Sequence, residues 1–199
     1  MKILPRDFYL RDDVVLIARE LLGKVLFSNF DGILTGGIIV ETEAYAGVID
    51  KASHAYGNRR TQRTEVMYSK GGTAYVYLCY GVHSLFNVVT NQENVPHAIL
   101  IRAIKPVIGI ETMQKRSGKE AMDAAFGTGP GKVSKLLGIH YSQSGIDLTK
   151  KPVEKQSQGI WLADEGNIIH PGAIIAGERI GVSYAGEDAL LPYRFRIVV

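Results

Sequence analysis

Residues 38–45 read Ile-Ile-Val-Glu-Thr-Glu-Ala-Tyr, and this run has the alternation of side chains that is typical of a β-strand. Strict alternation places Ile39, Glu41, Glu43 and Tyr45 on one face. Glutamate is uncommon in strands and is rarely buried unless it is paired. Two glutamates that point the same way beside a tyrosine indicate either a functional site or a half-exposed strand with a solvated acidic face.

The sequence around this strand predicts more strands than helices. Asp31-Gly32 is a typical hairpin turn, so the strand before it should pair with the strand after it. Asp12 or Asp13 can cap a helix that ends near Gly23. The expected strands are 24–29, 33–44, 73–80, 84–90, 98–107, 160–163, 173–176, 180–184 and 193–198, and the expected helices are 14–22, 109–117, 119–126 and 130–137.

Frequent hairpin signals without an alternation of strands and helices predict an α+β fold. We expect one domain over residues 1–199, with a curved, mostly antiparallel β-sheet and flanking helices. Residues 46–72 are polar and irregular, and a long irregular segment in a small domain is usually functional. Residues 141–159 are expected to form a surface loop.

The composition excludes several classes of protein. The chain has 199 residues, 46% of them hydrophobic, with mean hydropathy near zero, which is typical of a globular domain and excludes a disordered chain. No apolar stretch is long enough to span a bilayer, and no secretory signal is visible, so a cytoplasmic protein is expected. The one cysteine, Cys79, allows no internal disulfide. The five histidines lack metal-ligand spacing, so no metal site is expected.

Basic residues are clustered although the net charge is only +3. Arg59, Arg60, Arg63 and Lys70 lie close together, with Glu65 as the only acid among them. Such a cluster can follow a phosphate backbone or can be a solvated loop, and both interpretations stay open. Further cations follow at Lys132, Lys135, Lys150, Lys151 and Lys155.

Tyr80 comes immediately before Gly81, at the turn of the expected hairpin 73–90. Tyr75 and Tyr77 share a face of the first strand, where aromatic side chains are common. A large aromatic at a hairpin tip cannot pack into its own sheet. It either lies on the surface or inserts into a partner, as side chains of DNA-distorting proteins do.

Two polar residues interrupt apolar strands. Arg102 lies within Ala98–Ile104, and a buried arginine needs an anionic partner, for which Glu41 and Glu43 are candidates. The alternative is an edge strand with Arg102 in solvent. Asn87 lies within Leu85–Val89 and, if buried, has to find hydrogen-bond partners or offer its amide to a ligand.

The segment Gly127-Thr128-Gly129-Pro130-Gly131-Lys132 opens an expected helix. It is not a P-loop, because Phe126 stands where a glycine is required and Val133 follows the lysine. A glycine-rich helix start with proline in the first turn suits a single backbone phosphate, or it is only a structural turn.

Together these motifs resemble the alkyladenine (3-methyladenine) DNA glycosylase family, in order and spacing, from about residue 5 to the C-terminus. The matching motifs are Glu-Thr-Glu-Ala-Tyr (41–45), His54, Tyr-Val-Tyr-Leu-Cys-Tyr-Gly (75–81), Asn87, Leu-Ile-Arg-Ala (100–103), Gly-Pro-Gly-Lys (129–132), Arg-Ile-Gly-Val (179–182), Ala-Gly-Glu (185–187) and Pro-Tyr-Arg-Phe (192–195). The resemblance implies a sheet like the C-terminal domain of formyltransferases, with a protruding hairpin.

The resemblance also implies roles for single residues. Glu43 would be the general base that activates a water, with Arg102 helping to hold that water. Tyr45, His54 and Tyr77 would stack on a base flipped out of the duplex, Asn87 would exclude normal guanine, and Tyr80 would fill the gap. Phosphate contacts are expected from Arg59, Arg60, Arg63, Gly131 and Lys132. Glu41 receives no role beyond supporting the pocket or pairing with a cation.

The implied activity is hydrolysis of the N-glycosidic bond of 3-methyladenine, 7-methylguanine, hypoxanthine or ethenoadenine, without strand cleavage, because no lysine stands at a pocket position. Cationic bases are good leaving groups and suit an aromatic pocket, so one carboxylate that deprotonates water suffices for them. The expected partner is duplex DNA, with no cofactor and no membrane, and the expected protein is monomeric and associated with the nucleoid. The alternatives are a non-catalytic nucleic-acid-binding module of the same fold, which needs neither Glu43 nor Arg102, and a small-molecule hydrolase, for which Tyr80 has no purpose.

Overall fold

The computed structural model describes residues 1–118, 123, 125–152 and 158–197. Its centre is a curled sheet in the order β1-β7-β2-β3-β6-β5-β4, in which all the pairs are antiparallel. The strands are β1 (Lys2–Ile3), β2 (Val25–Phe30), β3 (Ile33–Tyr45), β4 (Ala74–Cys79), β5 (His83–Thr90), β6 (His97–Ile108), β7 (Gly159–Asp164), β8 (Ile174–Gly177) and β9 (Arg194–Ile197). The predicted α+β fold on a curved antiparallel sheet is confirmed.

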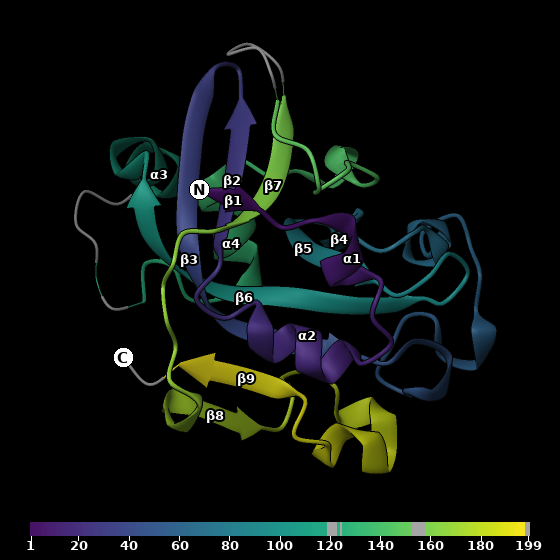
Figure 1. Ribbon diagram of the computed structural model, residues 1–199. Coiled ribbons are helices and arrows are strands. Elements are labelled where there is room, and N and C mark those ends of the chain that lie inside the picture. Colours follow the sequence, from purple (N-terminus) through teal and green to yellow (C-terminus); the bar gives the residue numbers. More distant parts are fainter. Residues whose placement is uncertain (119–122, 124, 153–157, 198–199) are drawn as a thin grey trace.

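Strand β9 pairs with the second half of β3 and also with β8. This β8–β9 ribbon lies at one end of the molecule, and the β2–β3 hairpin and β7 stand at the other end (Figure 1). The expected strands 173–176 and 193–198 correspond to β8 and β9. The expected strand 180–184 is wrong, because this segment enters a 3₁₀ helix, Ser183–Leu190.

The helices are α1 (Arg6–Tyr9), α2 (Val14–Glu20), α3 (Ile110–Ser117) and α4 (Pro130–Leu137). Asp13 caps α2 by accepting a hydrogen bond from the Leu16 N–H, as the sequence predicted. Both α3 and α4 end at glycines in the left-handed conformation, and the two helices pack against each other. The expected helix 119–126 lies mostly outside the described residues, and residues 125–127 form a turn.

One face of the sheet carries the main core. Alternate residues of the central strands point into it, together with the apolar sides of α2 and α4. Examples are Ala44 of β3, Val76 of β4, Phe86 and Val88 of β5, and Ile99 and Ile101 of β6. The residues between them point to the other face, where they form a pocket.

A β-bulge interrupts the alternation that the sequence of β3 suggests. Pairing with β6 passes from Ile39–Ile104 to Glu41–Ala103, so Val40 is an extra residue. Ile39 therefore lies in the main core with Ala44, and the prediction that it shares a face with Glu43 is wrong. A second irregularity follows, where pairing passes from Glu41–Ala103 to Thr42–Ile101 and leaves Arg102 as the extra residue of β6.

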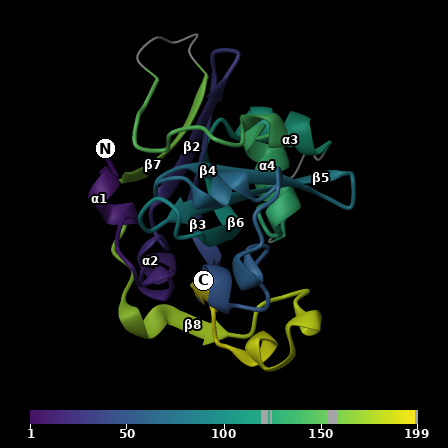
Figure 2. The ribbon, with the colours of Figure 1, turned by 90° about the vertical axis from the view of Figure 1, so that its right-hand side faces the viewer.

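The β4–β5 hairpin protrudes from the sheet (Figure 2). The Val82 N–H donates to the Cys79 carbonyl at 3.1 Å, and Tyr80 and Gly81 between them have φ of 51° and 71°. This is a type I′ turn, which requires positive φ at both central residues. A tyrosine in that conformation costs roughly 1 kcal/mol, which places Tyr80 at the tip at the expense of stability.

Candidate active site

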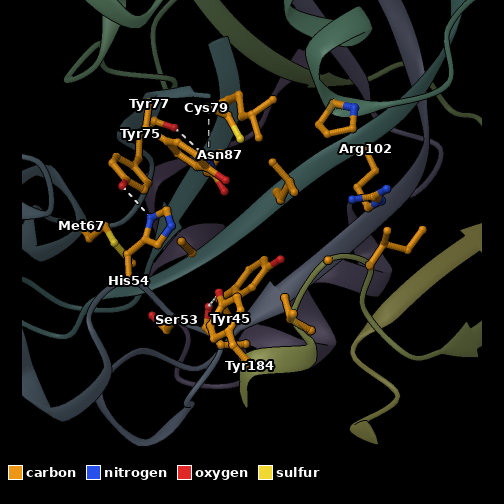
Figure 3. A pocket seen from close by; sticks show the side chains of 18 of the residues that line it. Tyr45, Ser53, His54, Met67, Tyr75, Tyr77, Cys79, Asn87, Arg102 and Tyr184 are labelled. Atoms are coloured by element: carbon orange, nitrogen blue, oxygen red, sulfur yellow. Dashed lines mark hydrogen bonds between the residues drawn. The ribbon is translucent and has the colours of Figure 1, made fainter. Parts of the chain in front are cut away.

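A pocket of about 200 Å³ opens on the face of the sheet opposite the main core. In the view of Figure 3, Tyr75 and Tyr77 lie on one side of it, Tyr45 and Tyr184 on the opposite side, and Arg102 at a third. Its wall comes from β3 to β6, from the irregular segment after β3, and from residues 180–184. The lining residues include Tyr45, Ala52, Ser53, His54, Met67, Tyr75, Tyr77, Cys79, Tyr80, Asn87, Leu100, Arg102, Pro130, Ile180, Val182 and Tyr184.

The aromatic wall is held by contacts between its own members. The His54 Nδ1 and the Tyr75 hydroxyl are 2.9 Å apart, and the His54 and Tyr77 rings meet edge to face with centroids 4.7 Å apart. Arg63 lies over the Tyr77 ring, 4.9 Å from its centroid. Burial, together with the charges of Arg63 and Arg59, lowers the pKa of His54 to about 4. His54 is therefore neutral at pH 7 and adds no positive charge to the wall that would repel a cationic ring.

Glu43 is completely buried directly behind this pocket. Its Oε1 accepts a hydrogen bond from the Ile180 N–H at 2.8 Å and lies 3.4 Å from Arg102 Nε. Its Oε2 accepts a 2.8 Å hydrogen bond from the Tyr45 hydroxyl. Burial raises the pKa of Glu43, while Arg102, Ile180 and Tyr45 partly counteract that rise. A carboxylate with a raised pKa is a better proton acceptor than an exposed one.

Arg102 is 12% exposed and paired, as the sequence predicted for an arginine within an apolar strand, and both glutamates are its partners. It lies in β6 between β3 and β5, so the edge-strand alternative is excluded. Its Nε is 3.4 Å from Oε1 of Glu41 and 3.4 Å from Oε1 of Glu43. Glu41 is also 3.1 Å from Arg194. Glu41 thus pairs with cations, as one of the two expectations for it stated.

Asn87 is held rigidly in the floor of the pocket. Its Nδ2 donates to the carbonyls of Tyr75 and Leu85, at 3.1 and 3.2 Å. Both donors of the amide are therefore used within the hairpin, and the side chain has little freedom to turn away from a ligand.

Tyr80 stands apart from these residues at the tip of the hairpin. Its side chain is 94% exposed, the most exposed of the large aromatic residues that the structure describes. It lies at the rim of the pocket, so an aromatic ring projects from the protein beside the opening.

The residues predicted to contact phosphates flank the pocket, but they differ in how many bonds they already make within the protein. Arg60 is bound to both carboxylate oxygens of Glu65, at 2.7 and 2.9 Å, and to Asn94 at 3.0 Å. Lys132 is exposed, and within the described part of the chain its Nζ donates to the Ala125 carbonyl, at 3.1 Å. Gly129 donates its N–H to the Arg102 carbonyl at 2.9 Å, so the glycine-rich segment also has the structural role left open above.

Several site residues had no assigned role in the sequence. Tyr184 lines the pocket and donates to the Ala52 carbonyl at 3.1 Å, and Ile180 contacts Glu43 through its backbone. The only sequence signal for them was the Arg-Ile-Gly-Val motif. Among the described residues, no group of three His, Cys, Asp or Glu side chains could hold a metal ion. No described helix is both long and apolar enough to cross a membrane.

The comparisons with known proteins agree on one family. Residues 7–198 match the family Methylpurine-DNA glycosylase (MPG). A protein of Chlamydia felis is 45% identical over 194 residues, which cover 97% of this chain and 95% of that protein. A protein of Clostridium perfringens is 42% identical over 201 residues, covering 98% and 95%, and one of Bacillus mycoides is 41% identical over 196 residues, covering 96% and 94%. All three carry the name "Putative 3-methyladenine DNA glycosylase".

Proposed function

Because the chain belongs to the Methylpurine-DNA glycosylase family and is a DNA glycosylase, we propose that it hydrolyses the N-glycosidic bond of damaged purines in duplex DNA with a water activated by Glu43. The observation that carries this proposal is the contact of Glu43 with Arg102 immediately behind an aromatic pocket. A non-catalytic binding module has no need of a buried carboxylate with a raised pKa at that place.

The chemistry needs few groups. The water oxygen forms a bond to the sugar C1′ as the bond from C1′ to the purine nitrogen breaks. The electron pair of the broken bond leaves with the base. Glu43 takes a proton from the water, and Arg102 orients that water and stays charged. A 3-methyladenine or 7-methylguanine base leaves as a neutral purine without acid catalysis, whereas hypoxanthine and ethenoadenine leave better when protonated.

The complete burial of Glu43 sets a requirement on this step. No solvent reaches the carboxylate, and Tyr45, Arg102 and Ile180 separate it from the pocket. Entry of the flipped nucleotide has to open room for one water between Arg102 and Glu43. A site that admits water only with substrate bound excludes bulk solvent from the reaction.

The remaining residues are proposed to select and hold the base. Tyr45, His54 and Tyr77 surround it, and electron-rich rings favour a cationic purine. Asn87, held by two backbone carbonyls, meets the 2-amino group of normal guanine. Tyr80 fills the gap left in the duplex, where flipping costs a few kcal/mol and costs least at damaged pairs.

Phosphate contacts from Arg59, Arg63, Gly131 and Lys132, with Arg60 once it leaves Glu65, would supply the salt-dependent affinity for duplex DNA. The protein is proposed to act as a monomer on nucleoid DNA in the cytoplasm. None of the described residues that line the pocket is a lysine, and we propose that the enzyme leaves an abasic site without cutting the strand.

The test is release of base from duplexes that carry one 7-methylguanine or one hypoxanthine, with the wild type and with Glu43→Gln. Glutamine keeps the shape of the side chain but cannot accept the proton. We expect the wild type to release both bases and leave the strand intact, and Glu43→Gln to bind the damaged duplex without releasing base. Full activity of Glu43→Gln would contradict the assignment of the general base.

A further inference from the structure

Arg179 forms a buried ion pair with Asp50 that the proposed mechanism does not use. The Arg179 side chain is 0% exposed and the Asp50 side chain 2%. Arg179 Nη1 contacts one carboxylate oxygen, and Nη2 donates to Oδ1 at 2.9 Å. Asp50 also accepts the N–H groups of Ala46 and Ala52, at 3.0 and 2.9 Å. Burying two charges is costly, so this bidentate pair needs an explanation.

The pair ties together three segments of the pocket wall. Arg179 Nη1 donates to the carbonyl of Ala44 in β3, and Nη2 donates to the carbonyl of Asp188 in the 3₁₀ helix, both at 2.9 Å. Asp50 anchors the segment that leads to Ser53 and His54. The Arg179 guanidinium also lies over the rings of Tyr45 and Tyr193, at 4.9 and 5.3 Å from their centroids.

Both donors to Glu43 are attached to what Arg179 holds. Ile180, whose N–H donates to Oε1, is the residue after Arg179, and Tyr45, whose hydroxyl donates to Oε2, has Arg179 on its ring. The Arg179 bond to the Ala44 carbonyl fixes the peptide unit that joins Ala44 to Tyr45. The two donors approach from different segments of the chain, and Arg179 contacts both segments.

We propose that Arg179, paired with Asp50, is a positioning residue that holds the Ile180 N–H and the Tyr45 hydroxyl against the two oxygens of Glu43. This inference rests on the proposed role of Glu43 as the general base. Arg179 acts through these two donors and does not touch the substrate. An error of about 1 Å in such a contact can cost about 100-fold in rate.

A purely structural ion pair makes a different prediction. Its loss would lower stability and reduce binding and rate together. Apart from the direct effect of the lost charge, which Arg179→Lys retains, it would leave the ionisation of Glu43 unchanged in the molecules that remain folded. Loss of a positioning residue removes donors that favour the ionised carboxylate, so the pKa of Glu43 rises further. The pH profile of base release distinguishes the two.

The experiment measures single-turnover release of 7-methylguanine against pH, because a cationic base requires no acid and its profile reports the general base alone. The groups that face Glu43 are Glu41, Tyr45, Arg102, Arg179 and Tyr184, with Arg194 bound to Glu41 from β9. We expect Arg179→Met to lower the rate at pH 7 by about 10- to 100-fold and to move the acid limb of the profile to higher pH, while affinity for the damaged duplex changes by less than about threefold.

Arg179→Lys keeps the buried charge but loses the bidentate contact. It replaces Arg179→Met as the test variant if the methionine variant does not fold. We expect it to lie between the wild type and Arg179→Met in rate. Arg6→Met is the matched control, because Arg6 likewise binds a carboxylate, that of Asp147, and a carbonyl, that of Gly71, away from the pocket. It should lose stability and keep the acid limb of the wild type.

An unchanged acid limb in both Arg179 variants overturns the inference, and so do equal losses of affinity and rate. Failure of the wild type to release base, or full activity of Glu43→Gln, contradicts the proposed function instead. The two failures are therefore separable in the same set of measurements.

Discussion

The Tyr45 hydroxyl donates a 2.8 Å hydrogen bond to Glu43, two residues earlier in the same strand. Tyr45, which lines the pocket, therefore also contacts the carboxylate behind it. Removing the hydroxyl while keeping the ring separates these two contacts.

Tyr45→Phe should move the acid limb of 7-methylguanine release to higher pH, because a hydrogen bond that favours the ionised Glu43 is lost and its pKa rises further. The ring remains, so affinity for the damaged duplex should change little. Single-turnover rates between pH 5 and 8 test this, with Tyr45→Ala as the variant that loses both contacts. An unshifted limb in Tyr45→Phe would show that the hydroxyl has no influence on Glu43.

Tyr80→Ala should weaken binding to a duplex with a damaged base by roughly 1–3 kcal/mol, because an aromatic stacking contact is removed. Binding to single-stranded DNA, which has no gap to fill, should change much less. Titrations with both DNAs measure this difference, and equal losses on the two would argue against insertion. The fold should not suffer, since the exposed tyrosine is in a strained conformation.

His54 should remain neutral down to about pH 4, because burial and the charges of Arg63 and Arg59 lower its pKa to about 4. An unfolded chain takes up this proton near pH 6.5, so the stabilising contribution is complete above that value and is lost as the pH falls from about 6.5 to 4. NMR titration of the His54 ring measures the pKa directly. A midpoint near 6.5 in the folded protein would contradict the described environment.

Lys132→Ala should reduce the salt dependence of binding to undamaged duplex by about one phosphate contact. Arg60→Ala should reduce it by less, because Arg60 already binds both oxygens of Glu65. The slope of log affinity against log salt concentration distinguishes the two. A larger effect of Arg60→Ala would mean that this ion pair opens on DNA.

Gly127→Ala should destabilise the protein by at least about 2 kcal/mol, because its Cβ would lie 1.9 Å from the Ile104 carbonyl oxygen. Gly127 keeps the start of α4 beside Arg102. Gly177→Ala is the control, since its Cβ would meet only the Arg194 side chain at 3.9 Å. Denaturant unfolding compares them, and similar midpoints would contradict the predicted clash.

Much of this fold is visible in local sequence. Asp31-Gly32 and Tyr80-Gly81 each lie at the turn of a hairpin, and Asp13 caps α2, because these signals depend on a few adjacent residues. Residues 180–184 have the composition of a strand, yet their backbone is shaped by the contact of Ile180 with Glu43 in β3 and by the anchoring of the preceding Arg179 on Asp50. Contacts so distant in sequence leave no periodic signal.

The site was predicted in part for the same reason. An arginine within an apolar strand requires a carboxylate, and Glu41 and Glu43 are carboxylates that also lie within a strand, so this contact could be inferred. The partnership of Arg179 with Asp50, 129 residues apart, could not be inferred, because each residue alone resembles an ordinary charged loop residue. The burial of Glu43 behind Tyr45 also depends on packing that no single segment encodes.

Because Val40 is an extra residue in β3, the face on which Glu43 lies depends on the number of residues between the bulge and Tyr45. Deleting Thr42 would make Glu41 and Glu43 direct neighbours and turn one of them to the core side of the sheet, whereas deleting Val40 would restore regular pairing and leave Ile39 and the glutamates on their present, opposite faces. Substituting Val40 changes no register, and a residue inserted at the exposed Asp31-Gly32 turn lies outside the paired strands. Variation in length should therefore be tolerated at the far end of this hairpin and forbidden between Glu41 and Tyr45. The number of residues in this part of β3, as much as the identity of any one side chain, therefore decides which groups reach the pocket.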